Sequence, residues 1–174
     1  MKARLFLIAA LSVAMSLCAS AADRQTPFSS PGYAGNVGLE LGGIVDGGFS
    51  SAILTEHGYQ FGFGLFTGIG TGAIVTPSSG MSYLAIPFFL DVRYRFLDGK
   101  ASPFVSMKFG GCYYYDRTVG LYAAPSVGVD IGRWSLFLKY DYRACSDVIA
   151  SNDVLVIAGD FKAHALSVGV NIWF

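Results

Sequence analysis

Charged residues and histidines are scarce in this sequence. Lysine, arginine, aspartate and glutamate make up 14% of the 174 residues, against about 25% in typical soluble proteins. Lysine and arginine together number 12, as do aspartate and glutamate, so the formal net charge is zero and no basic surface indicates nucleic-acid binding. The two histidines, His57 and His164, are isolated and no loop is rich in acids. We therefore expect neither a metal site nor a cofactor.

Long apolar runs are also missing. After Leu17 no unbroken run approaches the roughly 18 residues that a membrane-spanning helix needs, although 53% of the residues are hydrophobic. The apolar residues alternate with other residues instead, as in a β-strand with two different faces. In residues 82–96 every even position from Leu84 onward is apolar or aromatic, and the odd positions hold every charge.

The N-terminus has the pattern of a secretory signal peptide. Residues 1–4 carry two positive charges, residues 5–17 are apolar, and Ala19–Ala21 matches the small-x-small cleavage pattern. We predict that residues 1–21 are removed, with a cut one residue later as the alternative. A lipoprotein anchored at Cys18 is disfavoured, because Leu17 is larger than the residue expected before such a cysteine.

The remaining chain divides into a lead-in and one domain. Residues 22–35 are rich in proline, serine and glycine, and we expect the folded domain to span 36–174. No period of 3.6 residues indicates a helix there. Turn residues separate about eight strand-like runs of a length that suits a tilted transmembrane strand. The runs are 36–45, 50–61, 63–75, 82–96, 103–115, 120–131, 134–143 and 161–174.

Residue size decides which face of these strands points outward. An eight-stranded barrel has an interior just wide enough for side chains, and the residues between the large apolar ones are mostly small. We therefore predict an all-β, closed, antiparallel up-and-down transmembrane β-barrel of about eight strands, with its large apolar residues facing lipid. The alternative is a secreted soluble barrel with those residues inside. The residues predicted to face lipid include Leu84, Ile86, Phe88, Leu90, Val92, Leu136, Leu138, Val168, Val170 and Ile172.

Aromatic residues gather at the predicted strand ends, as in the interfacial girdles of membrane barrels. One group is Tyr113, Tyr115, Tyr140 and Tyr142, and the other is Phe96, Trp134, Trp173 and Phe174. With an even number of strands both chain ends lie on one side, which we expect to be periplasmic.

Four acids and five bases fall on the small-residue face. Charges in a low-dielectric lumen must be paired, so we predict a structural network of ion pairs that fills the barrel. The alternative is a gated or leaky path for protons or ions. The predicted network consists of Glu40, Asp91, Arg93, Arg95, Lys108, Asp130, Lys139, Asp141 and Arg143.

The sequence resembles the small outer-membrane β-barrel family of Gram-negative bacteria, the OmpA/OmpX-like eight-stranded barrels. It is most similar to the stand-alone barrel domains of Bacteroides-type organisms. The resemblance covers nearly all of the chain after the signal peptide, and its motifs describe architecture more than function. The segments that carry it are 57–70, 86–96, 102–111, 124–132 and 166–174.

The resemblance implies a monomeric protein of the bacterial outer membrane that contacts membrane lipid and lipopolysaccharide. The closing alternation that ends in Phe174 is similar to the signal that the outer-membrane assembly machinery recognises. The expected function is a structural or membrane-integrity role. The second candidate is a surface-exposed binding or adhesion protein that uses the long 144–160 connection.

A lipid-modifying enzyme is the third candidate. Lipid A deacylases are also eight-stranded barrels, and they use a His-x-Ser pair together with a glutamate on the lipid-facing wall. Here three positions separate His164 from Ser167, which places the two side chains on opposite faces of a strand. We therefore predict no enzymatic activity.

Two further features of the sequence are local. Cys112 and Cys145 form a disulfide if their Cα atoms approach within about 7 Å, and they are otherwise two small buried residues. Pro87 removes a hydrogen-bond donor from a strand that has no free edge, so we expect a β-bulge there.

Overall fold

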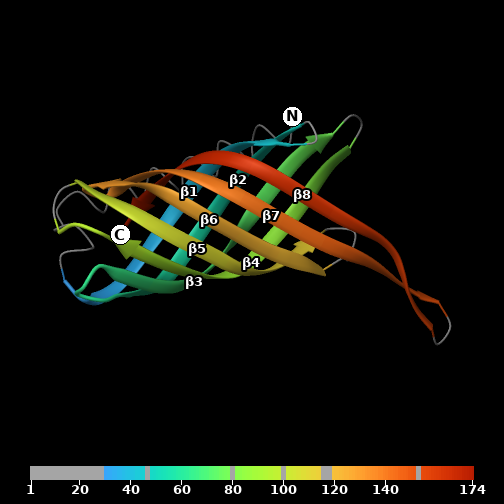
Figure 1. The fold of residues 1–174 in the computed structure, drawn as a ribbon, viewed down its shortest axis with the longest axis horizontal. Helices are drawn as coiled ribbons and strands as arrows, with labels where there is room; N and C mark the ends of the chain where they lie inside the picture. The colour runs from blue at the N-terminus through green and yellow to red at the C-terminus, as the bar shows by residue number, and fades with distance from the viewer. Residues whose placement is uncertain (1–29, 46–47, 79–80, 99–100, 115–118, 152–153) are drawn as a thin grey trace.

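The computed structural model describes residues 30–45, 48–78, 81–98, 101–114, 119–151 and 154–174, which form eight β-strands closed into one barrel (Figure 1). No helix among these residues is long and apolar enough to cross a membrane. The strands are β1 (Gly32–Ile44), β2 (Phe49–Gln60), β3 (Leu65–Ser78), β4 (Met81–Arg95), β5 (Ala101–Tyr114), β6 (Val119–Ile131), β7 (Trp134–Ser151) and β8 (Val154–Trp173).

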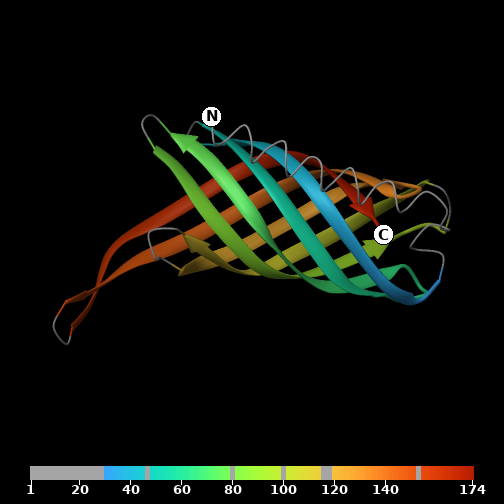
Figure 2. The same ribbon diagram turned by 180° about the vertical axis from the view of Figure 1, so that it is seen from behind.

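Each strand pairs antiparallel with the next, and β8 returns to pair with β1. Two backbone hydrogen bonds between Gly35 and Phe174, of 3.0 and 2.9 Å, join the first strand to the last residue. The start of β1 and the end of β8 therefore lie at the same end of the barrel, as both views show (Figures 1 and 2). The predicted fold class is confirmed.

The strands are strongly tilted. A row of paired residues that starts at Gly32 returns to β1 at Gly42, which is ten residues further along the strand. Such a shift arises because closure of a sheet requires its strands to tilt against the barrel axis. The row runs through Gln60, Phe66, Arg93, Ser106, Ser126, Lys139 and Ser167.

Two predicted boundaries differ from the structure. β1 begins at Gly32, inside the predicted lead-in of residues 22–35, because small residues with an extended backbone pair well with Gln60 and its neighbours. The predicted 144–160 connection is mostly strand: β7 and β8 remain paired out to Ser151 and Val154. They extend beyond the other strands as a hairpin (Figure 1). The predicted signal peptide lies outside the described residues.

The predicted bulge at Pro87 is wrong. The β3–β4 ladder pairs Thr71 with Phe88 and then Ile74 with Ala85, so the register does not shift across the proline. On the other side Pro87 lies opposite Cys112, again in an unshifted register. The strand therefore stays regular at Pro87, and the β3–β4 ladder is interrupted only between its Thr71–Phe88 and Ile74–Ala85 pairs.

Aromatic rings and glycines together fill the lumen. A Cβ atom added at Gly70 would lie 2.4 Å from the ring of Phe89, and one at Gly169 would lie 2.3 Å from the ring of Phe137. Small residues are therefore present, as predicted, but large rings occupy the space that they leave. Trp173 is one of these rings: it is fully buried inside the barrel, so its predicted place in an interfacial girdle is wrong.

Gly128 provides a test of this packing. A Cβ atom there would lie 2.3 Å from the backbone oxygen of Leu136 and 2.7 Å from the ring of Phe104. Gly128→Ala is therefore expected to lower the free energy of unfolding by about 1–3 kcal/mol, the range for overpacked cores. Gly43→Ala, which meets no atom within 4 Å, is the control. Urea titrations in lipid vesicles that give equal losses for both variants would contradict this packing.

Candidate functional site

The outer wall of the barrel is apolar over most of its described surface. The structure places the side chains predicted to face lipid outside the barrel, seven of them exposed and three partly exposed. Phe88 and Val168, for example, are 60% and 58% exposed. A wall of this kind is unsuited to water and matches the outward apolar band of a transmembrane barrel.

The lumen holds the charges. All nine residues of the predicted network lie inside the barrel, each at most 6% exposed, together with a fifth acid, Glu56. Among the described residues the buried acids and bases are thus equal in number, five of each, and the lumen carries no formal net charge.

The first group of charges lies around two lysines from β5 and β7. Lys108 Nζ lies 2.5 Å from Glu56 Oε1 and 3.9 Å from Glu40 Oε1. Lys139 Nζ contacts the other oxygen of Glu40 and lies 3.0 Å from Asp141 Oδ1. Because each lysine meets two carboxylates, the group connects β1, β2, β5 and β7 across the lumen.

Neutral side chains satisfy further atoms of this group. Asn36 Nδ2 donates to Glu56 Oε2 at 2.9 Å, and Ser167 Oγ donates to Asp141 Oδ2 at 3.0 Å. Lys139 Nζ donates to Tyr122 Oη at 3.3 Å. Buried charges are tolerated only when they are paired and hydrogen-bonded in this way.

The second group lies nearer the end of the barrel that holds the start of β1 and the end of β8. Asp130 contacts Arg93 Nη2 and also forms an ion pair with Arg95, whose Nε lies 3.0 Å from its Oδ2. Ser135 Oγ donates to Asp130 Oδ1 at 2.5 Å. Trp173 Nε1 in turn donates to Ser135 Oγ at 2.7 Å. One carboxylate therefore holds two guanidinium groups inside the wall.

Aromatic rings cover the cations. The guanidinium carbon of Arg93 lies 3.4 Å from the centroid of the Phe104 ring. Lys108 Nζ lies 5.4 Å from the ring centroid of Phe89 and 5.7 Å from that of Phe137. These contacts are within the range of cation–π attraction, and they leave the charged groups between side chains rather than along an open channel.

Sequence reasoning missed Glu56 because β2 has a weak alternation. In Phe49–Gln60 the buried positions are Ser50, Leu54, Glu56 and Gln60, whereas Ala52 and Gly58 between them are only partly buried. The available signal was the period of two along the strand, because Glu56 shares the even positions with Leu54 and Gln60, which are also buried.

The predicted separation of His164 and Ser167 agrees with their contacts. His164 Nδ1 lies 2.5 Å from Tyr140 Oη on the outer side, whereas Ser167 is 3% exposed and donates to Asp141 in the lumen. Among the described residues there is no group of three or more His, Cys, Asp or Glu side chains that could hold a metal.

The two cysteine positions lie on strands that are not neighbours. Both Cys112 on β5 and Cys145 on β7 pair with Gly120 of the intervening β6. Two strand spacings are about 9–10 Å, which exceeds the Cα separation of a disulfide. The backbone register therefore disfavours a bridge between them.

The fold has known structural neighbours. No family model and no curated protein sequence matches the chain. The outer membrane enzyme PagL superposes with a TM-score of 0.62 and 13% identity, over 79% of this chain and 98% of that one. A de novo designed transmembrane β-barrel gives 0.50 and 14%, over 87% and 100%. The Neisserial surface protein A gives 0.49 and 12%, over 83% and 99%.

At such low identities the likeness concerns architecture alone. The first two of these structures share with this chain a closed barrel of transmembrane strands. That likeness agrees with the apolar outer wall and the charged interior. The chain has the fold of the small eight-stranded outer-membrane β-barrels.

Proposed function

We propose that the protein is an integral, monomeric barrel of a Gram-negative outer membrane, of the OmpA/OmpX-like type, with a structural or membrane-integrity role. Both chain ends face the periplasm in this proposal, after export by the signal peptide. Phe174, which ends the alternating last strand, serves as the assembly signal. Membrane lipid and lipopolysaccharide are its surroundings, and the assembly machinery is its partner during insertion.

The filled lumen carries this proposal. Among the described residues, eight of the ten buried charges form ion pairs with one another across the barrel, and aromatic rings lie against Arg93 and Lys108. A pore needs continuous water, whereas these side chains occupy the interior at the diameter expected for eight strands. The proposal assigns the protein no catalytic role, in keeping with the separation of His164 from Ser167.

Planar-bilayer recordings test the filled lumen. The wild-type protein is expected to give no steady large channels, because the charged groups are held by partners on several strands. The double variant Phe89→Ala/Phe137→Ala removes the two rings beside Lys108 and is expected to raise the ion leak. Steady large channels from the wild-type protein would overturn the proposal.

The projecting hairpin favours a second candidate function, surface binding. β6 pairs with β7 only up to Cys145, and β1 pairs with β8 only up to Ala165. Beyond those residues the two strands pair with each other and, among the described residues, with no third strand. Open strand edges are templates for a partner's extended segment.

Deletion of residues 151–158 tests the surface-binding role. We expect the barrel to fold as before, because the β1–β8 and β6–β7 ladders do not include residues 151–158. Heat-modifiable mobility on gels measures this folding. Adherence of cells that display the protein to immobilised host matrix is expected to fall if the hairpin binds. Shortening the end of the β3–β4 hairpin, within residues 76–83, is the control. Equal adherence of all three proteins would exclude the projecting β7–β8 hairpin as the binding surface.

A further inference from the structure

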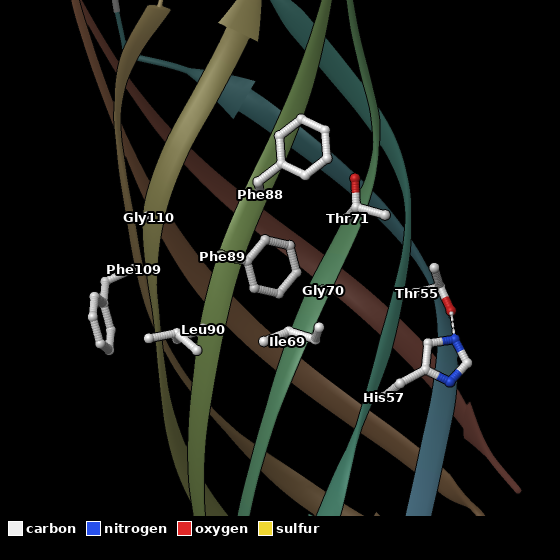
Figure 3. A pocket seen from close by; sticks show the side chains of 10 residues that line it. All are labelled: Thr55, His57, Ile69, Gly70, Thr71, Phe88, Phe89, Leu90, Phe109 and Gly110. Carbon is white, nitrogen blue, oxygen red and sulfur yellow. Dashed lines mark hydrogen bonds between the residues drawn. The ribbon is translucent and has the colours of Figure 1, made fainter.

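A groove lies on the outer wall of the barrel across four neighbouring strands, β2 to β5. Its volume is about 520 Å³, within the range of small-molecule pockets. Apolar side chains line it over most of its length, above a floor formed by Gly70, Phe89 and Gly110 (Figure 3). The other lining residues are Thr55, His57, Ile69, Thr71, Phe88, Leu90 and Phe109.

One end of this groove carries a hydrogen-bonded polar trio. Tyr33 Oη lies 2.5 Å from His57 Nδ1, and Thr55 Oγ1 lies 3.2 Å from His57 Nε2 (Figure 3 draws the second bond). Thr55 Oγ1 also donates to the backbone oxygen of Asn36 at 3.0 Å. Polar side chains are costly on a wall that faces hydrocarbon and suit the membrane interface, so this linked set of three marks the end of the groove that meets lipid headgroups.

The direction of these bonds indicates binding rather than catalysis. Because the Thr55 hydrogen is used by Asn36, the hydrogen between Thr55 and His57 is the one on Nε2, and Nδ1 accepts from Tyr33. His57 therefore does not act as a base toward Thr55. The hydrogen-bonding capacity that the trio has left is that of oxygen lone pairs, above all those of Tyr33, which is 66% exposed.

The register gives the groove a direction along the membrane normal. His57, Ile69, Leu90 and Phe109 form one paired row. His57 lies three residues from the end of β2, whereas Phe109 lies eight residues from the start of β5. Both of those strand ends are at the end of the barrel that holds the start of β1 and the end of β8. The groove therefore runs from the polar trio near that end to apolar residues deeper in the membrane.

We propose that this groove binds a glycerophospholipid of the periplasmic leaflet. One acyl chain lies over Ile69, Phe88 and Leu90, and Tyr33 Oη accepts a hydrogen bond from a headgroup ammonium such as that of phosphatidylethanolamine. The inference rests on the proposed outer-membrane location with periplasmic chain ends. Amphipathic tyrosines lie at headgroup depth in membrane proteins, and the second position of β1 places Tyr33 there.

Photocrosslinking tests this site on the full-length protein in vesicles. The probes are phosphatidylethanolamine and phosphatidylcholine, each with a diazirine in the middle of one acyl chain. We expect adducts on β3 and β4 to be about fivefold more frequent with phosphatidylethanolamine, as one added hydrogen bond allows. Tyr33→Phe is expected to abolish that difference, whereas Thr71→Trp fills the groove and lowers adducts from both probes.

Tyr140→Phe is the matched control, because Tyr140 Oη contacts His164 Nδ1 at the same 2.5 Å distance near the opposite end of the barrel. This variant is expected to keep the preference. Adducts spread evenly to Val127 and Val168 on the far wall, or equal adducts from the two probes, would overturn the lipid site while leaving the barrel's proposed role intact. A protein that forms no heat-modifiable barrel in vesicles would count against both proposals.

Discussion

Asp130→Ala is expected to destabilise the barrel by about 3–5 kcal/mol, the cost of leaving a buried charge without its partner. The carboxylate is fully buried and is shared by Arg93 and Arg95. Its loss leaves two guanidinium groups inside the wall facing one another, and Ser135 loses the acceptor of its hydroxyl. Urea titration of the protein in lipid vesicles, followed by tryptophan fluorescence, measures the change.

The second variant in this test removes one of the stranded cations. Asp130→Ala combined with Arg93→Met is expected to recover part of the lost stability, because a buried apolar chain replaces a buried cation that has lost the Asp130 carboxylate. Met at this position also keeps a side chain between Phe104 and Trp173. A loss below about 1 kcal/mol for Asp130→Ala would show that water reaches this part of the lumen.

Leu138→Arg is expected to cost about 2–4 kcal/mol, the range for a cation on the lipid face near the bilayer midplane. Leu138 is 44% exposed on the outer wall, and its cross-strand partners are Val127 and Val168. The charged variant would therefore place its guanidinium among aliphatic side chains and hydrocarbon. Leu90→Arg on β4 is expected to behave in the same way.

A position near the barrel end provides the depth control for this variant. Ile131 is also exposed, but it is the last residue of β6 and lies beside the Gly132–Arg133 turn. Ile131→Arg is expected to cost about 0–1 kcal/mol, because the cation reaches the interface. Equal losses for Leu138→Arg and Ile131→Arg in vesicle refolding would mean that the outer wall does not face a bilayer.

Much of the architecture follows from alternation alone. A period of two assigns each residue to a face, and residue size then assigns the faces to lumen and exterior, as at Leu90 and Asp91. Trp173 was misplaced because aromatic residues at strand ends suggest a girdle, although its neighbour Ile172 already pointed outward. Its indole instead fills space beside Phe66.

Pairing across strands could not be predicted in the same way. The shift of ten residues around the barrel decides which rows meet, and it brings Glu40 to Lys139 and Glu56 to Lys108. The outer groove is hidden from the sequence for the same reason, because its lining comes from four strands. His57 looked isolated in the sequence until the register placed Tyr33 beside it.

The bonds between Gly35 and Phe174, which join the two ends of the domain, have a consequence for assembly. β8 must be synthesised before β1 gains its second neighbour. Glu40 likewise gains its partner only after Lys139, which lies 99 residues later in the chain, has been synthesised. A partly inserted chain would therefore expose both a bare sheet edge and unmatched charges to hydrocarbon. Insertion is thus expected to be concerted, with the strands entering the bilayer together rather than one hairpin at a time.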